Sequence, residues 1–84
     1  MRLYRFTLIL ASDPTEEQVD RLYGSFQGDV LSGVQAGVCY LDCTLEAPTF
    51  DEAVRRALKP VRAEGLIVER IEVDSDSLAA LEAA

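Results

Sequence analysis

The sequence predicts an α+β fold in which two helices cover one face of a four-stranded antiparallel sheet. Four segments carry the apolar alternation of strands, and two carry the i, i+3, i+4, i+7 spacing of helices. These segments follow one another in the order β-α-β-β-α-β. With 84 residues, of which 49% are hydrophobic, the chain has enough apolar side chains for the core of one domain.

The first strand is expected at residues 2–11. Side chains at its even positions are apolar, and we expect them to be buried: Tyr4, Phe6, Leu8 and Leu10. Side chains at its odd positions are mixed, and we expect them to face outward: Leu3, Arg5, Thr7 and Ile9. The interruption by Arg5 and the Asp13-Pro14 that follows distinguish this segment from a signal peptide.

The first helix is expected to begin after Asp13, which suits the N-cap position. Pro14 then occupies the first helical position, and Glu16 completes a capping box. The apolar stripe of this helix follows the helical spacing: Val19, Leu22, Tyr23 and Phe26. Gly28 is expected to end the element.

A β-hairpin is expected at residues 29–46, with arms at 29–34 and 38–46. The turn Gln35-Ala36-Gly37 contains a glycine that can supply the positive φ of a tight reversal. In the second arm one set of side chains is expected in the core: Cys39, Leu41, Cys43 and Leu45. The alternate set is expected to face outward: Val38, Tyr40, Asp42, Thr44 and Glu46.

The second helix is expected to have Thr49 as its N-cap and Glu52 as the capping-box partner. Its core stripe is apolar throughout: Phe50, Ala53, Val54, Ala57, Leu58 and Val61. Pro60 removes one helical hydrogen bond and predicts a kink or a distorted last turn. Gly65 is expected to end the helix.

The last strand is expected at residues 66–73. Ile67, Ile71 and Val73 share one face, but so does Glu69. Either Glu69 lies at an edge, or a β-bulge resets the alternation there. The other positions are expected to point outward: Leu66, Val68, Arg70 and Glu72.

This order of elements is typical of a ferredoxin-like sandwich with strand order 4-1-3-2 and both helices on one face. We interpret residues 1–74 as a single domain and residues 75–84 as a short C-terminal helical tail. The sheet face without helices is expected to be rich in apolar groups: Leu3, Ile9, Val38, Leu66 and Val68. This content indicates a binding or dimer interface, and the alternative is a face partly covered by the tail or by loops.

The chain is strongly acidic, with 15 acidic and 8 basic residues and a net charge of −7. This charge argues against direct binding to nucleic acid or to an anionic membrane surface. No segment approaches the roughly 20 apolar residues of a membrane span. We therefore expect a cytoplasmic protein.

The composition also argues against catalysis. The sequence has no histidine, which excludes histidine-based catalysis and the common zinc sites, and it has no glycine-rich phosphate loop. Cys39 and Cys43 are expected roughly 13 Å apart on one strand, too far for a disulfide, and are interpreted as structural. We therefore expect no enzyme activity, no metal and no cofactor.

Two acidic clusters, one around the first helix and one in the last sixteen residues, are candidates for partner contact. The candidate contact residues combine these clusters with the outward positions of the sheet: Arg5, Tyr40, Asp42, Glu46, Glu16, Glu17, Asp20, Glu72, Asp74 and Asp76. The alternative is that the acidity only provides solubility. The basic run at Arg55, Arg56, Lys59 and Arg62 is expected to be neutralised by carboxylates one helical turn away, and the alternative is a docking site for an acidic partner.

Several stretches resemble the N-terminal domain of small bacterial helix-turn-helix regulators: residues 4–10 (YRFTLIL), 37–42 (GVCYLD), 46–54 (EAPTFDEAV) and 68–74 (VERIEVD). In that family a DNA-binding helix pair follows the last strand, and we expect this protein to be without it. The resemblance therefore implies the partner-binding half without DNA recognition. By analogy with this family, we expect a free acidic domain of this kind to act as an inhibitor of the anti-CRISPR, antitoxin or immunity type.

These observations together predict a non-catalytic protein that acts by binding another protein. The preferred hypothesis is an acidic inhibitor that blocks a basic, nucleic-acid-handling partner. The alternative hypothesis is a homodimeric regulatory domain that holds a small ligand where two open sheet faces meet.

Overall fold

The computed structural model describes residues 1–73 and contains four strands and two helices. In chain order the elements are β1 (Arg2–Leu10), α1 (Glu16–Ser25), β2 (Asp29–Gln35), β3 (Val38–Ala47), α2 (Phe50–Ala63) and β4 (Val68–Glu72). The tail expected at residues 75–84 lies outside the described residues.

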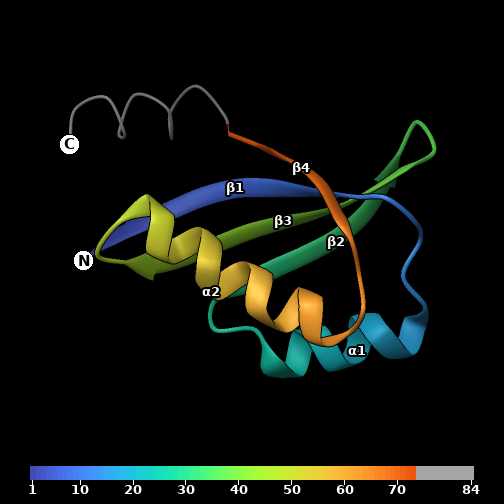
Figure 1. Ribbon diagram of the computed structural model, residues 1–84, viewed down its shortest axis with the longest axis horizontal. Coiled ribbons are helices and arrows are strands. Elements are labelled where there is room, and N and C mark those ends of the chain that lie inside the picture. The colour runs from blue at the N-terminus through green and yellow to red at the C-terminus, as the bar shows by residue number, and fades with distance from the viewer. Residues whose placement is uncertain (74–84) are drawn as a thin grey trace.

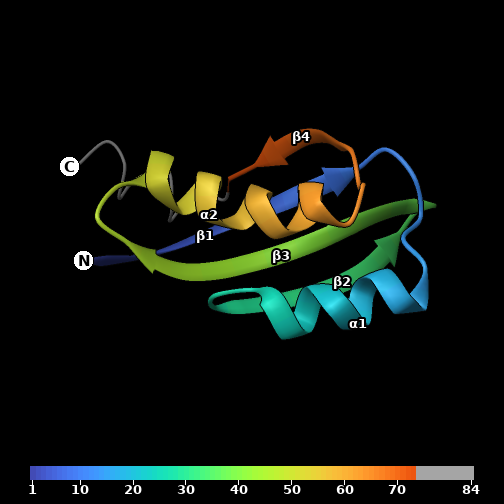
Figure 2. The ribbon, with the colours of Figure 1, turned by 60° about the horizontal axis from the view of Figure 1, so that its bottom comes forward.

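The four strands form one antiparallel sheet in the order β2-β3-β1-β4. This is the predicted order 4-1-3-2 read from the other edge, and both helices lie on one side of the sheet (Figures 1 and 2). The α+β sandwich predicted from the sequence is therefore confirmed. β1 and β3 are the central strands, β2 and β4 are the edges, and within residues 1–73 no helix lies on the second face of the sheet.

The core lies between the sheet and the helices and has the strand parity that the sequence predicts. Leu8 and Leu41 face each other across the central strands, and both are fully buried. Leu22 of α1 and Val61 of α2 are fully buried above them. Phe50 at the start of α2 makes edge-on ring contacts at 5.7 Å with two aromatic residues of β1, Tyr4 and Phe6.

Helix α1 begins two residues later than predicted. Thr15 is the N-cap, and it forms a reciprocal capping box with Gln18 in place of the expected pair of Asp13 and Glu16. The carboxylate of Asp13 instead accepts a hydrogen bond from the thiol of Cys39, with 2.8 Å between the two heavy atoms. Asp13 and Thr15 both have side chains that suit an N-cap. Because Asp13 is bound to Cys39, Thr15 takes the N-cap position.

Helix α2 follows the prediction more closely. The hydroxyl of Thr49 accepts the N–H of Glu52, as expected, although the carboxylate of Glu52 pairs with Arg56. Pro60 is accommodated inside a helix that continues to Ala63. The helix then closes with hydrogen bonds from Gly65 N–H to Arg62 and from Leu66 N–H to Val61.

A β-bulge in β4 corrects the predicted orientation of the last strand. Ile9 pairs with Arg70 and Leu10 with Val68, so Glu69 is the extra residue. Val68 therefore points to the helix side, and Leu66 is buried in the core at 7% exposure. The prediction that both residues face outward on the open face is wrong. A bulge at Glu69 is one of the two explanations that the sequence predicts, and the structure confirms it.

The hairpin between β2 and β3 turns through Ala36 and Gly37, which have φ angles of 52° and 77°. Two-residue turns with positive φ at both positions favour Asn-Gly, because asparagine tolerates this conformation better than alanine. We expect Ala36→Asn to raise the free energy of unfolding by about 0.5–1 kcal/mol in urea titrations. Ala36→Val is the matched control and should lower it, and stabilisation by valine would contradict the turn geometry.

Candidate protein-contact face

The open face is the sheet surface opposite the helices, and its side chains lie in rows across the strands. One row runs Asp29, Thr44, Arg5, and the next runs Leu31, Asp42, Thr7, Glu72. A third row runs Gly33, Tyr40, Ile9, Arg70, and Glu46 lies beside Leu3 at the far end. The outward positions predicted for β1 and β3 are confirmed, which places five of the candidate contact residues on this face: Arg5, Tyr40, Asp42, Glu46 and Glu72.

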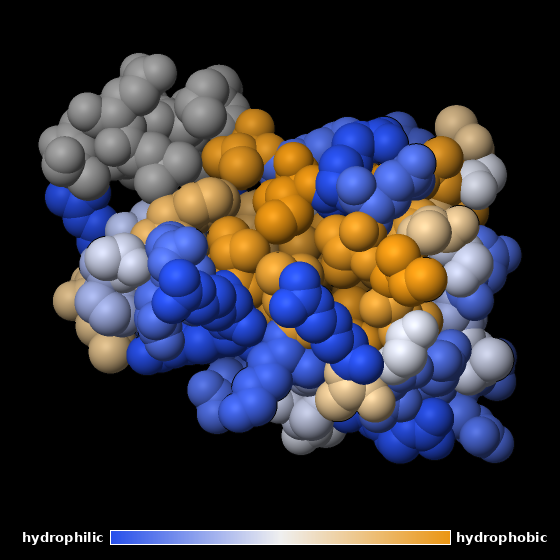
Figure 3. Space-filling model, viewed as in Figure 1, coloured by the Kyte–Doolittle hydropathy of each residue, from blue (hydrophilic) through white to orange (hydrophobic). Residues whose placement is uncertain are grey.

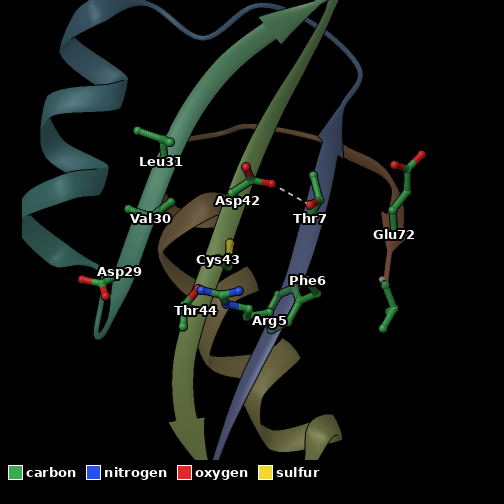
Figure 4. A pocket seen from close by; sticks show the side chains of 11 residues that line it. Arg5, Phe6, Thr7, Asp29, Val30, Leu31, Asp42, Cys43, Thr44 and Glu72 are labelled. Carbon is green, nitrogen blue, oxygen red and sulfur yellow. Dashed lines mark hydrogen bonds between the residues drawn. The ribbon is translucent and has the colours of Figure 1, made fainter. Parts of the chain in front are cut away.

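The first two rows surround a hollow of about 510 Å³ that is open to solvent on one side. Figure 4 shows Asp42 and Thr7 at its centre, Glu72 on the β4 side, and the side chain of Arg5 extended across Thr44. The hydroxyl of Thr7 donates to the carboxylate of Asp42 across β1 and β3, with 2.6 Å between the oxygens. This bond holds the carboxylate of Asp42 in the middle of the face.

The charges of this face are predominantly negative. Among the described residues it carries four carboxylates, Asp29, Asp42, Glu46 and Glu72, against two guanidinium groups. One of the guanidinium groups, Arg70, is already paired with Glu72 at 3.1 Å. Within residues 1–73, Arg5 forms no ion pair within 4 Å, although it lies between acidic neighbours.

The apolar content of the open face is lower than the sequence predicts. Ile9 is only 5% exposed between its row neighbours Tyr40 and Arg70. The ring of Tyr40 lies over Gly33, where a Cβ would clash with the tyrosine hydroxyl. Tyr40 is therefore engaged in packing across the edge strand, and the exposed apolar groups of this face lie elsewhere: Leu3, Leu31 and Val38.

Two residues of this face were not predicted from the sequence, Asp29 and Leu31, and Leu31 is 62% exposed. The length of the hairpin turn determines the position of Leu31 on this face. A two-residue turn at Ala36-Gly37 pairs Gln35 with Val38, and counting outward from that pair places Leu31 opposite Asp42. The sequence predicted a three-residue turn at residues 35–37, which does not give this pairing of β2 with β3.

The acidic residues of α1 form a different surface. Glu16, Glu17 and Asp20 are exposed on α1, which lies on the same side of the sheet as α2 (Figures 1 and 2). The hollow lies on the open face, on the other side of the sheet. Asp74 and Asp76 lie outside the described residues. The ten candidate contact residues therefore do not form one site, and the five on the sheet are the ones that the structure brings together.

The two cysteines are buried in the core, as the sequence predicts. The hydrogen bond to the Asp13 carboxylate raises the pKa of Cys39 above its ordinary value. Burial raises the pKa of Cys43 to about 12. Thiols with raised pKa values are poor nucleophiles near neutral pH, because the reactive form is the thiolate.

A second cavity of about 740 Å³ lies between α1 and α2 and is lined by four basic side chains: Arg21, Arg55, Arg56 and Lys59. Most of this charge is matched locally. Arg55 pairs with Asp51 at 3.0 Å and Arg56 with Glu52 at 3.4 Å, which are the two i, i+4 pairs that the sequence predicts. Arg21 pairs with Glu64 at 2.7 Å and joins the two helices. These pairs are typical of a self-neutralised helix surface.

Comparison with known proteins gives no match: no family model, no curated protein and no solved structure resembles the chain significantly. Within residues 1–73, no cluster of three or more carboxylates or thiols is arranged to hold a metal ion. Neither helix of this part of the chain has the length and apolar character of a membrane span.

Proposed function

We propose that this protein is a non-catalytic binding module that presents the open face of its sheet to a basic protein. The observation that carries the proposal is the hollow around Asp42, which gathers carboxylates from three strands on the open face of the sheet. The net charge of −7 supports the same partner chemistry. A basic surface of the kind that handles nucleic acid is the complementary target, so the protein acts as an acidic inhibitor that occupies such a surface.

The geometry of the hollow favours insertion of a lysine or arginine side chain. The aliphatic part of such a side chain would lie against Leu31, which is largely exposed, and its charged end would meet Asp42. Arg5 at the other side of the hollow would donate hydrogen bonds to a carboxylate of the same partner. Because charges of both signs would contact the partner, its orientation on the open face would be fixed. Long-range attraction between the acidic protein and the basic partner would raise the association rate at low salt.

A second candidate function follows from the same hollow. Its volume of about 510 Å³ lies within the range of small-molecule sites, roughly 300–1,000 Å³. Arg5 and the nearby carboxylates suit a small zwitterion held between the open faces of a homodimer. Ligand binding raises the melting temperature by mass action, so a thermal-shift screen with zwitterionic metabolites tests this function.

The open-face double variant Asp42→Asn/Glu46→Gln is expected to weaken binding to the basic partner by about tenfold at low salt. The matched control is Glu16→Gln/Glu17→Gln on α1, which changes the net charge by the same amount on the other side of the protein. Asparagine keeps an oxygen that can accept the Thr7 hydroxyl, so the fold of the open-face variant is expected to be intact. The measurement is a titration of captured partner at two salt concentrations.

The control separates location from total charge. If both double variants lose affinity equally, only the overall charge matters and the open face is not the contact. If the α1 variant alone loses affinity, the acidic surface of α1 is the contact. Partner binding that is insensitive to salt would contradict the electrostatic proposal.

A further inference from the structure

The cavity between α1 and α2 concentrates positive charge in an acidic protein. Half of the chain's eight basic residues line it: Arg21, Arg55, Arg56 and Lys59. Among the described residues, two carboxylates line it as well, those of Glu52 and Glu64. Figure 3, drawn in the view of Figure 1, shows hydrophilic side chains gathered along the side of α2 that lies toward α1. The cavity volume of about 740 Å³ lies within the range of small-molecule sites, roughly 300–1,000 Å³.

Uncharged residues complete the lining and leave room for the body of a ligand: Gly24, Ser25, Gln27, Pro60 and Ala63. A Cβ at Gly24 would meet no atom within 4 Å, so the α1 side of the cavity is open at this position. Pro60 and Ala63 offer apolar surface from α2. The cavity therefore combines cationic side chains with a region that can contact an uncharged organic group.

Two of the four cations are held in place by contacts within the fold. The guanidinium of Arg21 donates to the carboxylate of Glu64 at 2.7 Å and joins the two helices. The guanidinium of Arg56 donates to the carboxylate of Glu52 and, at 3.2 Å, to the backbone carbonyl of Glu46. These contacts fix Arg21 and Arg56 in the wall of the cavity.

The other two cations, Lys59 and Arg55, are available to a ligand. Within residues 1–73, Lys59 forms no ion pair within 4 Å. Arg55 pairs with Asp51, but the two side chains are 71% and 73% exposed, and such exposed pairs are weak. Lys59 follows Arg55 by four residues on α2, so the two cations are neighbours that repel each other. An anion held between them would relieve this repulsion.

We propose that this cavity binds a small phosphate monoester, with Lys59 and Arg55 holding its phosphate group. Such a group carries a charge of about −1.5 to −2 near pH 7, which matches these two cations. The forked N–H donors of Arg55 suit phosphate oxygens, and the ammonium of Lys59 supplies a compact charge. The organic part of the ester lies against Pro60 and beside Gly24.

A small anion fits this cavity better than a polyanion does. The net charge of −7 repels a nucleic acid strand along its length. At physiological ionic strength charges are screened beyond about 8 Å, so a small ligand in the cavity mainly experiences the cations that line it. The cavity lies between the helices, away from the open face, so this site does not depend on the proposed protein partner.

A titration of phenyl phosphate into the isotope-labelled full chain, followed by amide chemical shifts, tests the proposal. Shifts are expected at residues 21–27 and 55–63. Lys59→Gln is expected to weaken binding about tenfold, because a charge-assisted contact is lost. Arg62→Gln is the matched control, because Arg62 is exposed on the same helix but does not line the cavity. The control should change the affinity by less than about twofold, since its charge is screened.

Gly24→Leu tests the location of the site without removing a charge. Leucine is favoured over glycine in a helix, and the position has free space, so this variant is expected to fold and to fill the cavity. Binding of phenyl phosphate should be lost. Gly24→Ala should keep most of the affinity, because a single methyl group occupies little of the cavity.

Four results would overturn the proposal. Equal weakening by Lys59→Gln and Arg62→Gln would show that only overall charge matters, and binding retained by Gly24→Leu would place the ligand outside the cavity. Shifts at Thr7 and Asp42 in place of the helices would assign the phosphate to Arg5 on the open face. Equal binding of phenol would remove the role of the anion. A glutamate-rich peptide that binds the same amides more tightly than phenyl phosphate would assign the cavity to an acidic protein segment.

Discussion

Replacing Gly28 with alanine is expected to lower the free energy of unfolding by about 3–5 kcal/mol, because two independent costs act at this position. Gly28 has a φ of +146°, a conformation that is strained for any residue with a side chain. A Cβ there would also lie 2.6 Å from the carbonyl oxygen of Thr44 and 2.8 Å from Cβ of Leu45. Because the carbonyl belongs to a central strand, it cannot move aside without disturbing the sheet.

Gly24→Ala is the matched control for Gly28→Ala. Gly24 lies in the exposed part of α1, and a Cβ there would meet no atom within 4 Å. Alanine at a helical position is favoured over glycine, so this variant should be more stable by about 0.5–1 kcal/mol. Urea unfolding followed by circular dichroism measures both changes. A loss below 1 kcal/mol for Gly28→Ala would show that β2 and β3 approach each other less closely than the structure indicates.

Gly28 also connects the fold to the candidate site. It is the last residue before β2, and its close approach to β3 sets where Asp29 begins the edge strand. Asp29 is paired with Thr44 in the row that contains Arg5. A partly folded Gly28→Ala variant is therefore expected to lose the edge of the hollow before it loses the central strands.

Strand parity and helix faces were predictable because they depend on local periodicity. Cys39 and Cys43 alternate with leucines, so their burial and the outward direction of Asp42 follow from the two-residue period of a strand. The helical stripe around Ala53 and Ala57 follows from the 3.6-residue period in the same way. These signals need no knowledge of the neighbouring elements.

The candidate site was less predictable because it depends on the register between strands. The exposure of Leu31 and the burial of Ile9 are both set by residues on neighbouring strands. Because of the bulge at Glu69, Val68 points to the helix side and not to the open face as predicted. The sequence alone could not distinguish this bulge from an edge position of Glu69. The start of α1 was missed because Asp13 is bound to Cys39, a contact between residues 26 positions apart.

The stability of the protein is expected to fall steeply above pH 9, because the thiol of Cys43 is buried in the core. Burial raises its pKa from 9.0 to about 12, and the nearby Asp42 adds to the shift. The folded state therefore holds this proton more tightly than the unfolded state. The contribution is fully present below pH 9 and is lost as the pH rises toward 12, at about 1.4 kcal/mol per pH unit and about 4 kcal/mol in total.

Cys43→Ala removes this ionisable group and should flatten the decline between pH 9 and pH 11, at a cost of about 1 kcal/mol near neutral pH. Cys39→Ala is the matched control, because it leaves Cys43 in place and should keep most of the decline. The hydrogen bonds with Ser32 lower the pKa of Tyr23, and this opposite contribution cancels when the variants are compared at each pH. Urea unfolding at several pH values measures the slopes.

Thiol labelling provides a second readout of the same environment. The side chain of Cys43 is surrounded by Phe6 and Val30 on the neighbouring strands and is 1% exposed, so a thiol reagent at pH 8 should modify it only through unfolding. The labelling rate of Cys43 should therefore rise in Gly28→Ala and fall in Gly24→Ala, in proportion to the unfolded population. Fast labelling of Cys43 in the native protein, or equal pH slopes for the native protein and Cys43→Ala, would contradict the raised pKa.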